Sequence, residues 1–409
     1  MMRTITACAL AAVWMTAVTV PAAGAAAGPA VAATSLQAWG VNDIGQLGNG
    51  TKSDFSKIPV PATLPAGTRL RSVSAGCGFA LAVTSSGQVL SWGSNRDGRL
   101  GLGPGGPRSS LVPVPALIPP GDVVTAVAAG CHHALALTAD GQVLAWGKNL
   151  LGSVGTGRAT DAPVLTPTRV RLPHGTHVIA IAAGYDTSVA VTATGAVWTW
   201  GTGQFGQLGN GTQGGPGTIS AAPVRVPLPA GVKGRAVATG TGDDYLLTTT
   251  GQVWAWGGNG LRELGAGLKT GIATRPVQVL LPAGTRVASL AAGCDFVLAR
   301  TTAGSVFGWG DNHSRELSGV RATIVNRPRP LGLPAGIQVT ALGASCSSSL
   351  ALLADGRILA WGQNGNGELG TGGHANINPD PAPVALPGGF TATRIGSGSQ
   401  AHGSYALGH

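Results

Sequence analysis

A tryptophan–glycine pair recurs seven times in this chain, and its spacing is the strongest constraint on the fold. The pair returns roughly every 54 residues. Each copy opens a glycine-rich stretch of the form W-G-x-N-x-x-G-x-L-G-x-G, as in "WGQNGNGELGTG" at residues 361–372. Such a repeat indicates one supersecondary unit per copy, which needs its neighbours to bury its apolar face. We therefore expect structural, buried tryptophans at Trp39, Trp92, Trp146, Trp200, Trp256, Trp309 and Trp361.

Two further landmarks lie between the tryptophans. One is an L-P-x-G turn, as at residues 64–67, and the other is a stretch such as "VAAGCHHALAL" at residues 127–137. A turn ending in glycine follows, and then a strand such as "GQVLAW", in which apolar residues alternate with small ones. Each unit is therefore interpreted as three short strands separated by turns, followed by a glycine-rich loop. Short strands in units of this length are typical of a propeller blade rather than a helical solenoid.

The two ends of the repeat array complement each other. The chain ends just where the next "GQVLAWG" strand would begin, and "SLQAWG" at residues 35–40 supplies such a strand near the start. Pairing the two would close the ring and remove its exposed edges. We predict an all-β, seven-bladed propeller over residues 34–409, closed by the N-terminal strand in the C-terminal blade.

The motifs resemble those of the regulator of chromosome condensation repeat family, with the likeness covering residues 35–407. The resemblance implies a seven-bladed propeller. The founding member is a nuclear guanine-nucleotide exchange factor, and related secreted bacterial propellers include protein inhibitors of β-lactamases. The family's histidine in A-G-x-x-H is kept here as His133. Other residues replace it in the remaining copies that align without ambiguity: Phe79, Thr187, Tyr245, Phe296 and Ser348. This loss weakens the expectation of exchange activity.

Residues 1–33 have the pattern of a secretion signal. "MMR" is a short basic start, an apolar stretch follows, and small residues precede an expected cleavage site near Ala33. The alternative is a membrane anchor, but the apolar stretch is short for a span. We therefore expect a secreted, extracellular protein without a membrane segment after cleavage.

Four cysteines, Cys77, Cys131, Cys294 and Cys346, occupy one repeat position in two pairs of adjacent units. Export would permit disulfides, and adjacency favours pairing Cys77 with Cys131 and Cys294 with Cys346. The alternative is four buried free thiols that fill small sites. No metal site is expected, because the cysteines lack the C-x-x-C spacing of zinc ligands.

Charge and motifs do not predict nucleic-acid binding or catalysis. The chain has 26 Lys and Arg against 16 Asp and Glu, a formal net charge of +10. The basic residues are scattered, whereas a nucleic-acid groove usually shows a basic stripe. Matches to G-x-G-x-x-G lie in the repeat loops without a following helix, so no dinucleotide cofactor is expected. No metalloprotease or nucleophile-elbow motif occurs. We predict a monomeric non-enzyme without cofactors.

The residues beside the conserved landmarks differ from unit to unit and mix aromatic with charged groups, a composition typical of interfaces. The predicted protein-binding residues are His132, His133, Tyr185, Asp186, Asp243, Asp244, Tyr245, Asp295 and Phe296. The leading hypothesis is a secreted protein-binding module, with inhibition of the bound protein as one form of that role. The alternatives are an exchange factor and an enzyme in the central channel. The channel enzyme would rest on an acidic arc of Asp186, Asp243, Asp244 and Asp295.

Overall fold

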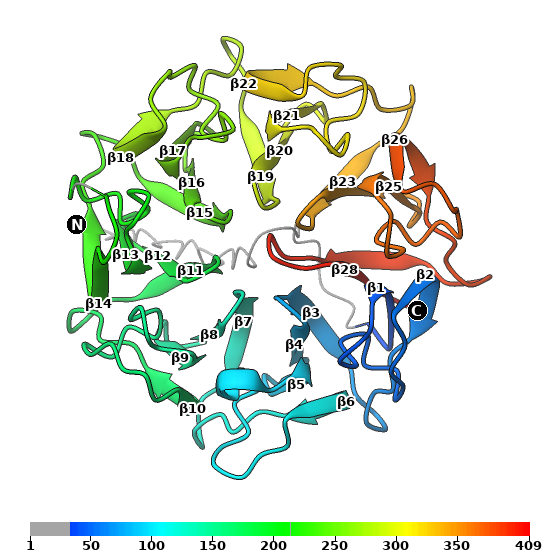
Figure 1. Ribbon diagram of the computed structural model, residues 1–409, viewed down its shortest axis with the longest axis horizontal. Helices are drawn as coiled ribbons and strands as arrows, with labels where there is room; N and C mark the ends of the chain where they lie inside the picture. The colour runs from blue at the N-terminus through cyan, green and yellow to red at the C-terminus, as the bar shows by residue number, and fades with distance from the viewer. Residues whose placement is uncertain (1–32, 213) are drawn as a thin grey trace, which may run out of the picture.

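The computed structural model describes residues 33–212 and 214–409, so the expected signal sequence lies, except for Ala33, outside the described residues. Seven four-stranded antiparallel sheets surround a central axis (Figure 1). The predicted all-β, seven-bladed propeller is confirmed. In the described part of the chain, no helix has the length and hydropathy needed to cross a bilayer.

Each blade has four strands, counted outward from the axis. The innermost strands are β3 (Leu70–Ala75), β7 (Val124–Ala129), β11 (Val178–Ala183), β15 (Gly234–Thr239), β19 (Val287–Ala292), β23 (Val339–Ala344) and β27 (Ala392–Gly396). The second strands are β4 (Phe79–Thr84), β8 (His133–Thr138), β12 (Thr187–Thr192), β16 (Asp243–Thr248), β20 (Phe296–Thr301), β24 (Ser348–Leu353) and β28 (Gly403–Gly408).

The third strands carry the repeat tryptophans: β5 (Val89–Ser94), β9 (Val143–Gly147), β13 (Val197–Thr202), β17 (Val253–Gly258), β21 (Val306–Asp311), β25 (Ile358–Gln363) and β1 (Ser35–Val41). The outer strands are β6 (Ser109–Pro115), β10 (Val164–Arg169), β14 (Ile219–Val226), β18 (Ile272–Gln278), β22 (Ile324–Pro330), β26 (Ile377–Pro383) and β2 (Phe55–Pro61). We number the blades 1 to 7 from the blade of β3. A short 3₁₀ turn, η1 (Arg96–Gly98), lies in the loop of blade 1.

Blade 7 combines both ends of the chain, as predicted. Strand β1 pairs antiparallel with β28, with Leu36 opposite Leu407 and Trp39 opposite Ser404. Figure 1 shows β1 and β2 beside β28, which closes the ring. Ala33, at the end of the expected signal sequence, is buried and forms a bridge with Leu70 of blade 1.

The outer strand of each blade was not predicted, because its residues fall within the presumed loop after Trp-Gly. Every outer strand contains proline, and four have alternating prolines, as in "IPVP" of β2 and "VPVP" of β6. Proline cannot donate to a ladder, but an edge strand tolerates it on the unpaired side. The strand register also shifts near the repeat glycine, for example between Ser91 and Gly93. Gly93 has φ +88°, and a Cβ there would lie 2.4 Å from the Gly78 oxygen.

The repeat tryptophans are buried between blades and fix the loop of the preceding blade. Trp146 is fully buried, and its Nε1 donates to the Arg99 carbonyl at 2.8 Å. The loop asparagine adds a second constraint: Asn149 accepts from the Val154 N–H and donates to the Arg158 carbonyl. The tryptophan bond recurs in every blade except at Trp309, and the asparagine recurs in every blade except blade 3, which has Gly203. These bonds hold the glycine-rich loops on the next blade.

Candidate binding face

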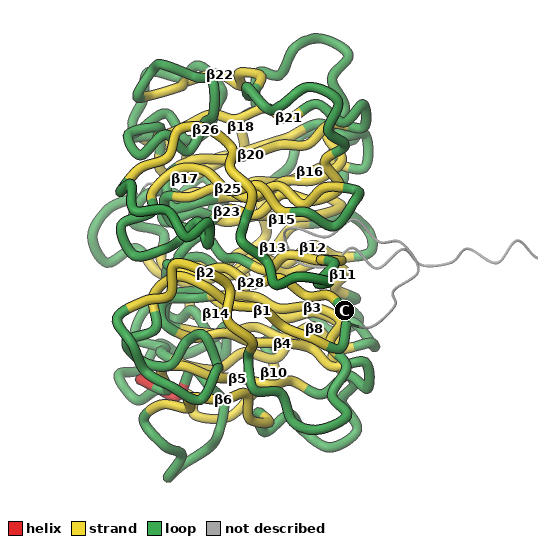
Figure 2. Tube along the Cα trace, turned by 90° about the vertical axis from the view of Figure 1, so that its right-hand side faces the viewer, coloured by secondary structure: helices red, strands yellow, loops and turns green. Residues whose placement is uncertain are grey.

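The ring has two faces with different loops (Figure 2). On one face lie the turns between first and second strands, which hold the four cysteines, together with the glycine-rich loops. We name it the Cys face. The other face carries the turns between second and third strands and the L-P-x-G loops, and we name it the Pro face.

Six of the nine predicted binding residues are buried, and five of the six lie in second strands, where they cannot form a contact surface in this structure. His133, Asp243, Asp244, Tyr245 and Phe296 are each at most 3% exposed. They lie in second strands, which have a strand on each side and a blade against each face. That part of the predicted surface is therefore wrong.

The alignment that placed Tyr245 at the family's histidine position, and hence Asp243 at the cysteine position of blade 4, is also wrong by two residues. Thr241, not Asp243, lies at the cysteine position, as its backbone N–H donates to the Cys294 carbonyl. Asp243 instead begins β16, where His133 begins β8. The predicted acidic arc is not an exposed surface, because Asp186, Asp243 and Asp244 are all buried.

His132, Tyr185 and Asp186 form a cluster at the seam between blades 2 and 3 on the Cys face, in which Asp186 is only 5% exposed. The Tyr185 ring, which is 41% exposed, meets the His132 ring edge to face at a centroid distance of 4.8 Å. The His132 Nδ1 lies 3.0 Å from an oxygen of Asp186. Phe205 was not predicted; it is 47% exposed and packs on Gly242 of blade 4. An apolar residue at the sixth position of the loop motif would have been the signal for it. Asp295 is half-buried in the equivalent turn of blade 5.

Exposed apolar side chains are concentrated on the Cys face. Of the twelve exposed large apolar residues that the described chain contains, eight lie in its loops or at the adjacent ends of the outer strands. These are Phe55, Leu150, Tyr185, Phe205, Ile219, Ile272, Ile324 and Ile377. The other four are Ile58, Leu117, Val123 and Leu280. Exposed large apolar side chains are therefore more numerous on the Cys face than on the Pro face.

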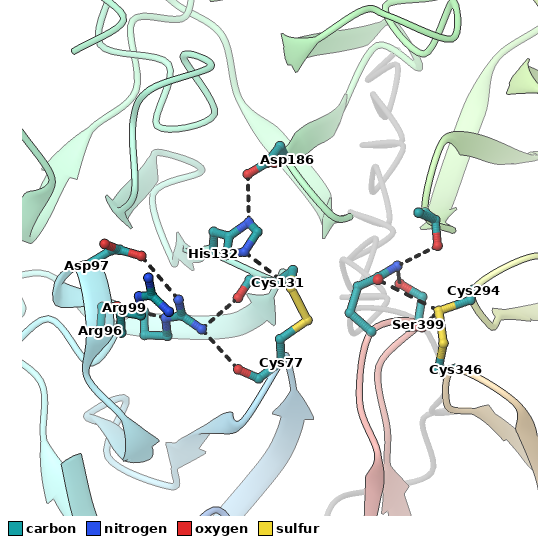
Figure 3. The surroundings of a disulfide bond; sticks show 12 residues. Cys77, Arg96, Asp97, Arg99, Cys131, His132, Asp186, Cys294, Cys346 and Ser399 are labelled. Carbon is teal, nitrogen blue, oxygen red and sulfur yellow. Dashed lines mark hydrogen bonds and ion pairs between the residues drawn. A yellow bond between two sulfur atoms is a disulfide. The ribbon is translucent and has the colours of Figure 1, made fainter. Parts of the chain in front are cut away.

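Two disulfides join adjacent blades beside the channel mouth (Figure 3). Cys77–Cys131 and Cys294–Cys346 are the predicted pairs, with Cα atoms 4.5 Å and 4.4 Å apart. Arg99 reinforces the first pair, because its guanidinium donates at 3.0 Å to the carbonyls of both Cys77 and Cys131.

Removing each disulfide should lower the free energy of unfolding by about 2–4 kcal/mol, since each closes a loop of more than 50 residues. We expect the double variants Cys77→Ser/Cys131→Ser and Cys294→Ser/Cys346→Ser to unfold at lower denaturant concentration than the parent. The control is the same titration under reducing conditions, where parent and variant should become similar. Equal midpoints without reductant would contradict a stabilising role.

Carboxyl groups gather on blades 4 and 5 near the same face. Desolvation, followed by the charge of Glu263, raises the pKa of buried Asp243. Desolvation raises the pKa of Glu263 and of Glu316 to about 7. It also raises the pKa of Asp295, with the charge of Asp311 as a second cause. No group of three or more potential metal ligands comes together within residues 33–212 and 214–409.

The central channel offers little acid–base chemistry. Its cavity has a volume of about 60 Å³ and is lined by small and aliphatic residues of the innermost strands, such as Ser74, Ala128, Ala182, Ala292 and Ser397. None of the described residues that line it is ionisable. The proposed acidic arc therefore does not line this cavity.

Comparison with known proteins identifies the repeat. A family model described as "RCC1-like domain" matches residues 22–402. The Arabidopsis thaliana ultraviolet-B receptor UVR8 is 33% identical over 283 residues, covering 69% of this chain and 62% of that protein. A Bos taurus secretion-regulating guanine nucleotide exchange factor is 28% identical, covering 90% of this chain and 82% of its own length.

A solved structure shows the same fold. Yeast RCC1 (Prp20), in its complex with Kap60, superposes with a TM-score of 0.83 at 21% identity, covering 100% of this chain and 96% of that one. The family match extends over most of the sequence, and both the seven repeats and the ring geometry agree with it. The chain belongs to the RCC1-like domain family.

Proposed function

We propose that this protein is a secreted, non-enzymatic module that binds another protein through its Cys face. The observation that carries the proposal is the concentration of eight exposed apolar side chains on that face. Tyrosine is enriched among residues that dominate binding energy, and the Tyr185 ring packs against His132, which contacts Asp186. Loops held on a rigid scaffold are suited to such recognition.

Rigidity supports the proposal, because a preorganised surface loses little entropy on binding. The loops are fixed by the tryptophan and asparagine hydrogen bonds, such as those of Trp146 and Asn149. Two disulfides tie neighbouring blades beside this surface.

Disulfides persist in oxidising compartments, and together with the N-terminal sequence pattern they support export. Mass spectrometry of the culture medium should find a chain beginning near residue 34; an exclusively cell-retained, uncleaved chain would contradict export.

The exchange-factor alternative has less support from the residues. The family's histidine survives as His133, and here it is buried with its Nε2 2.8 Å from the Ser188 hydroxyl of the next blade. That contact gives it a structural role between blades. The alternative rests on the names of the relatives rather than on a site in this chain.

Substituting Tyr185 and Phe205 together should weaken partner binding at least about tenfold, as loss of a hot-spot pair does. We would capture partners from the native secretome on the immobilised parent, then compare affinities for Tyr185→Ala/Phe205→Ala. The matched control is Leu117→Ala/Leu280→Ala, which removes exposed apolar groups from the Pro face. The control should bind like the parent. Equal binding by both variants would place the interface elsewhere.

A further inference from the structure

A groove on the Pro side of the seam between blades 3 and 4 has no role in the proposed protein-binding face. It has a volume of about 670 Å³, within the range of ligand pockets. Its lining includes Arg225 of β14, Lys233 just before β15, and Arg275 of β18. We name it the blade 3–4 groove. Three cations from two blades therefore line one concave surface.

The three cations lack acidic partners. Among the described residues that line the groove, none is Asp or Glu, and none of the three cations belongs to the ion pairs found between described residues. Blade 2 shows the contrast. Arg169 has the strand register of Arg225, and it pairs with Asp122 at 2.8 Å. The blade 3–4 groove thus holds concentrated positive charge that an anion can neutralise.

Two glycines let the neighbouring blade approach these cations closely. A Cβ at Gly195, which has φ +82°, would lie 2.6 Å from the Cβ of Lys233. A Cβ at Gly211, which has φ +89°, would lie 2.7 Å from the Arg275 Nε. The Gly195 carbonyl also accepts the Gly234 N–H at 2.9 Å. The backbone beside Lys233 and the guanidinium of Arg275 are therefore positioned by blade 3.

The repeat provides six internal comparisons. The position of Arg225 faces the residue two before the repeat tryptophan, and the position of Lys233 directly precedes the innermost strand of the next blade. The position of Arg275 lies two residues after the partner of the repeat glycine. Blades 4–5 hold Gln278, Arg286 and Arg327; blades 5–6 hold Pro330, Gln338 and Asp380; blades 6–7 hold Pro383, Thr391 and Ile58. The remaining sets are Pro61, Arg69 and Val112; Pro115, Val123 and Thr166; and Arg169, His177 and Ala222. Only blades 3–4 place Lys or Arg at all three positions.

The groove continues past Arg225 into a second cavity of about 320 Å³ on blade 3. The two share Thr194, Ala196 and Arg225, and the second is also lined by Trp198 and His177. Half-buried Trp198 offers a flat apolar surface next to the cations. A ligand can therefore place anionic groups against the arginines and a ring against the indole.

We infer that the blade 3–4 groove binds a small oligoanion carrying two or three phosphate or sulfate groups. A guanidinium donates two parallel hydrogen bonds to such a group, and an ammonium adds a point charge. Arg225 and Arg275 supply the paired donors from opposite sides of the seam, while Lys233 contacts the ligand between them. This site is independent of the Cys face.

Calorimetric titration with inorganic tripolyphosphate and with a trisulfated disaccharide tests the inference on the full propeller. At least one probe should bind, and the preferred probe distinguishes phosphate from sulfate ligands. Arg225→Gln, Lys233→Gln and Arg275→Gln should each weaken binding about tenfold, the effect of losing one charge-assisted contact. All three residues are exposed, so unchanged thermal unfolding should verify that the variants fold.

Arg327→Gln is the matched control, because Arg327 lies against Gly267 at the next seam as Arg275 lies against Gly211. This substitution should change the affinity less than about twofold, since the control contributes only distant charge. Failure of both probes to bind would overturn the inference. So would an equal loss in Arg327→Gln, which would indicate nonspecific attraction to a basic surface. Loss of oligoanion binding should leave partner capture by the Cys face unchanged.

Discussion

Deleting residues 1–41 should unfold the whole ring rather than blade 7 alone. The deletion removes β1, whose Trp39 is fully buried and donates to the Glu368 carbonyl at 2.9 Å. Strand β28 would lose one of its two partner strands and expose an unpaired edge. The free energy of unfolding should fall by more than the cost of truncating one buried aromatic residue, about 3–5 kcal/mol. This fall is comparable with the whole stability of a typical domain, about 5–15 kcal/mol. Near-ultraviolet circular dichroism should show no fixed tertiary structure.

A circular permutant distinguishes the effect of losing β1 from the effect of moving the chain ends. The Thr34 N–H donates to the Gly408 carbonyl at 3.2 Å, so a short linker can join His409 to Ala33. New ends can be placed in the exposed L-P-G-G turn between Gly388 and Gly389. This permutant keeps β1 and should melt near the parent temperature. If the truncated chain also melts there, closure by β1 is not what stabilises the ring.

The repeat allowed blade number, ring closure and cysteine pairing to be predicted, because each depends only on which residues are equivalent. Cys77 and Cys131 share a repeat position in consecutive blades, so they meet wherever those blades pack. The outer strands were missed because their prolines are typical of loops, although a proline after every glycine-rich loop, as P-x-P in four of the seven blades, was a usable signal.

Exposure in the second strands was harder to predict from residue type. Asp243, Tyr245 and Phe296 differ between blades and look like surface positions, yet both sides of these strands are covered. Asp243 and Tyr245 instead form a local network: the Tyr245 hydroxyl donates to Asp243 and lies 2.8 Å from the Glu263 carbonyl. The blade 3–4 groove was also hidden, because its three cations are scattered in the sequence and meet only when adjacent blades pack.

Replacing Glu263 and Glu316 with glutamine should stabilise the protein at alkaline pH and have little effect at acid pH. Both carboxyl groups are buried at one loop position, and each accepts a backbone N–H from two residues earlier. Gln46 and Gln207 make this same contact in other blades. The substitution therefore keeps the hydrogen bond and removes the buried charge.

The direction of this pH dependence follows from proton binding by the two carboxyl groups. Burial raises the pKa of each carboxyl group from 4.5 in the unfolded chain to about 7 in the fold. The folded state then holds more protons between these values, so the parent loses stability as pH rises from 4.5 to 7. The shift corresponds to roughly 3 kcal/mol for each group. The free energy of unfolding of each variant should therefore match the parent at pH 4 and exceed it by about that amount at pH 8.

Denaturant titrations at pH 4 and pH 8 measure this difference for Glu263→Gln, Glu316→Gln and the control Glu368→Gln. Glu368 occupies the same position in blade 6, but its carboxylate accepts both the backbone N–H of Asn366 at 2.8 Å and its side-chain amide at 3.1 Å. Losing a charge-assisted bond opposes any gain there, so Glu368→Gln should not stabilise the protein at pH 8. A gain at Glu263 or Glu316 that is equal at both pH values would arise from packing rather than from a buried charge. Because these carboxyl groups lie beneath the Cys face, a gain confined to alkaline pH would show that this face covers ionised groups whose burial destabilises the fold.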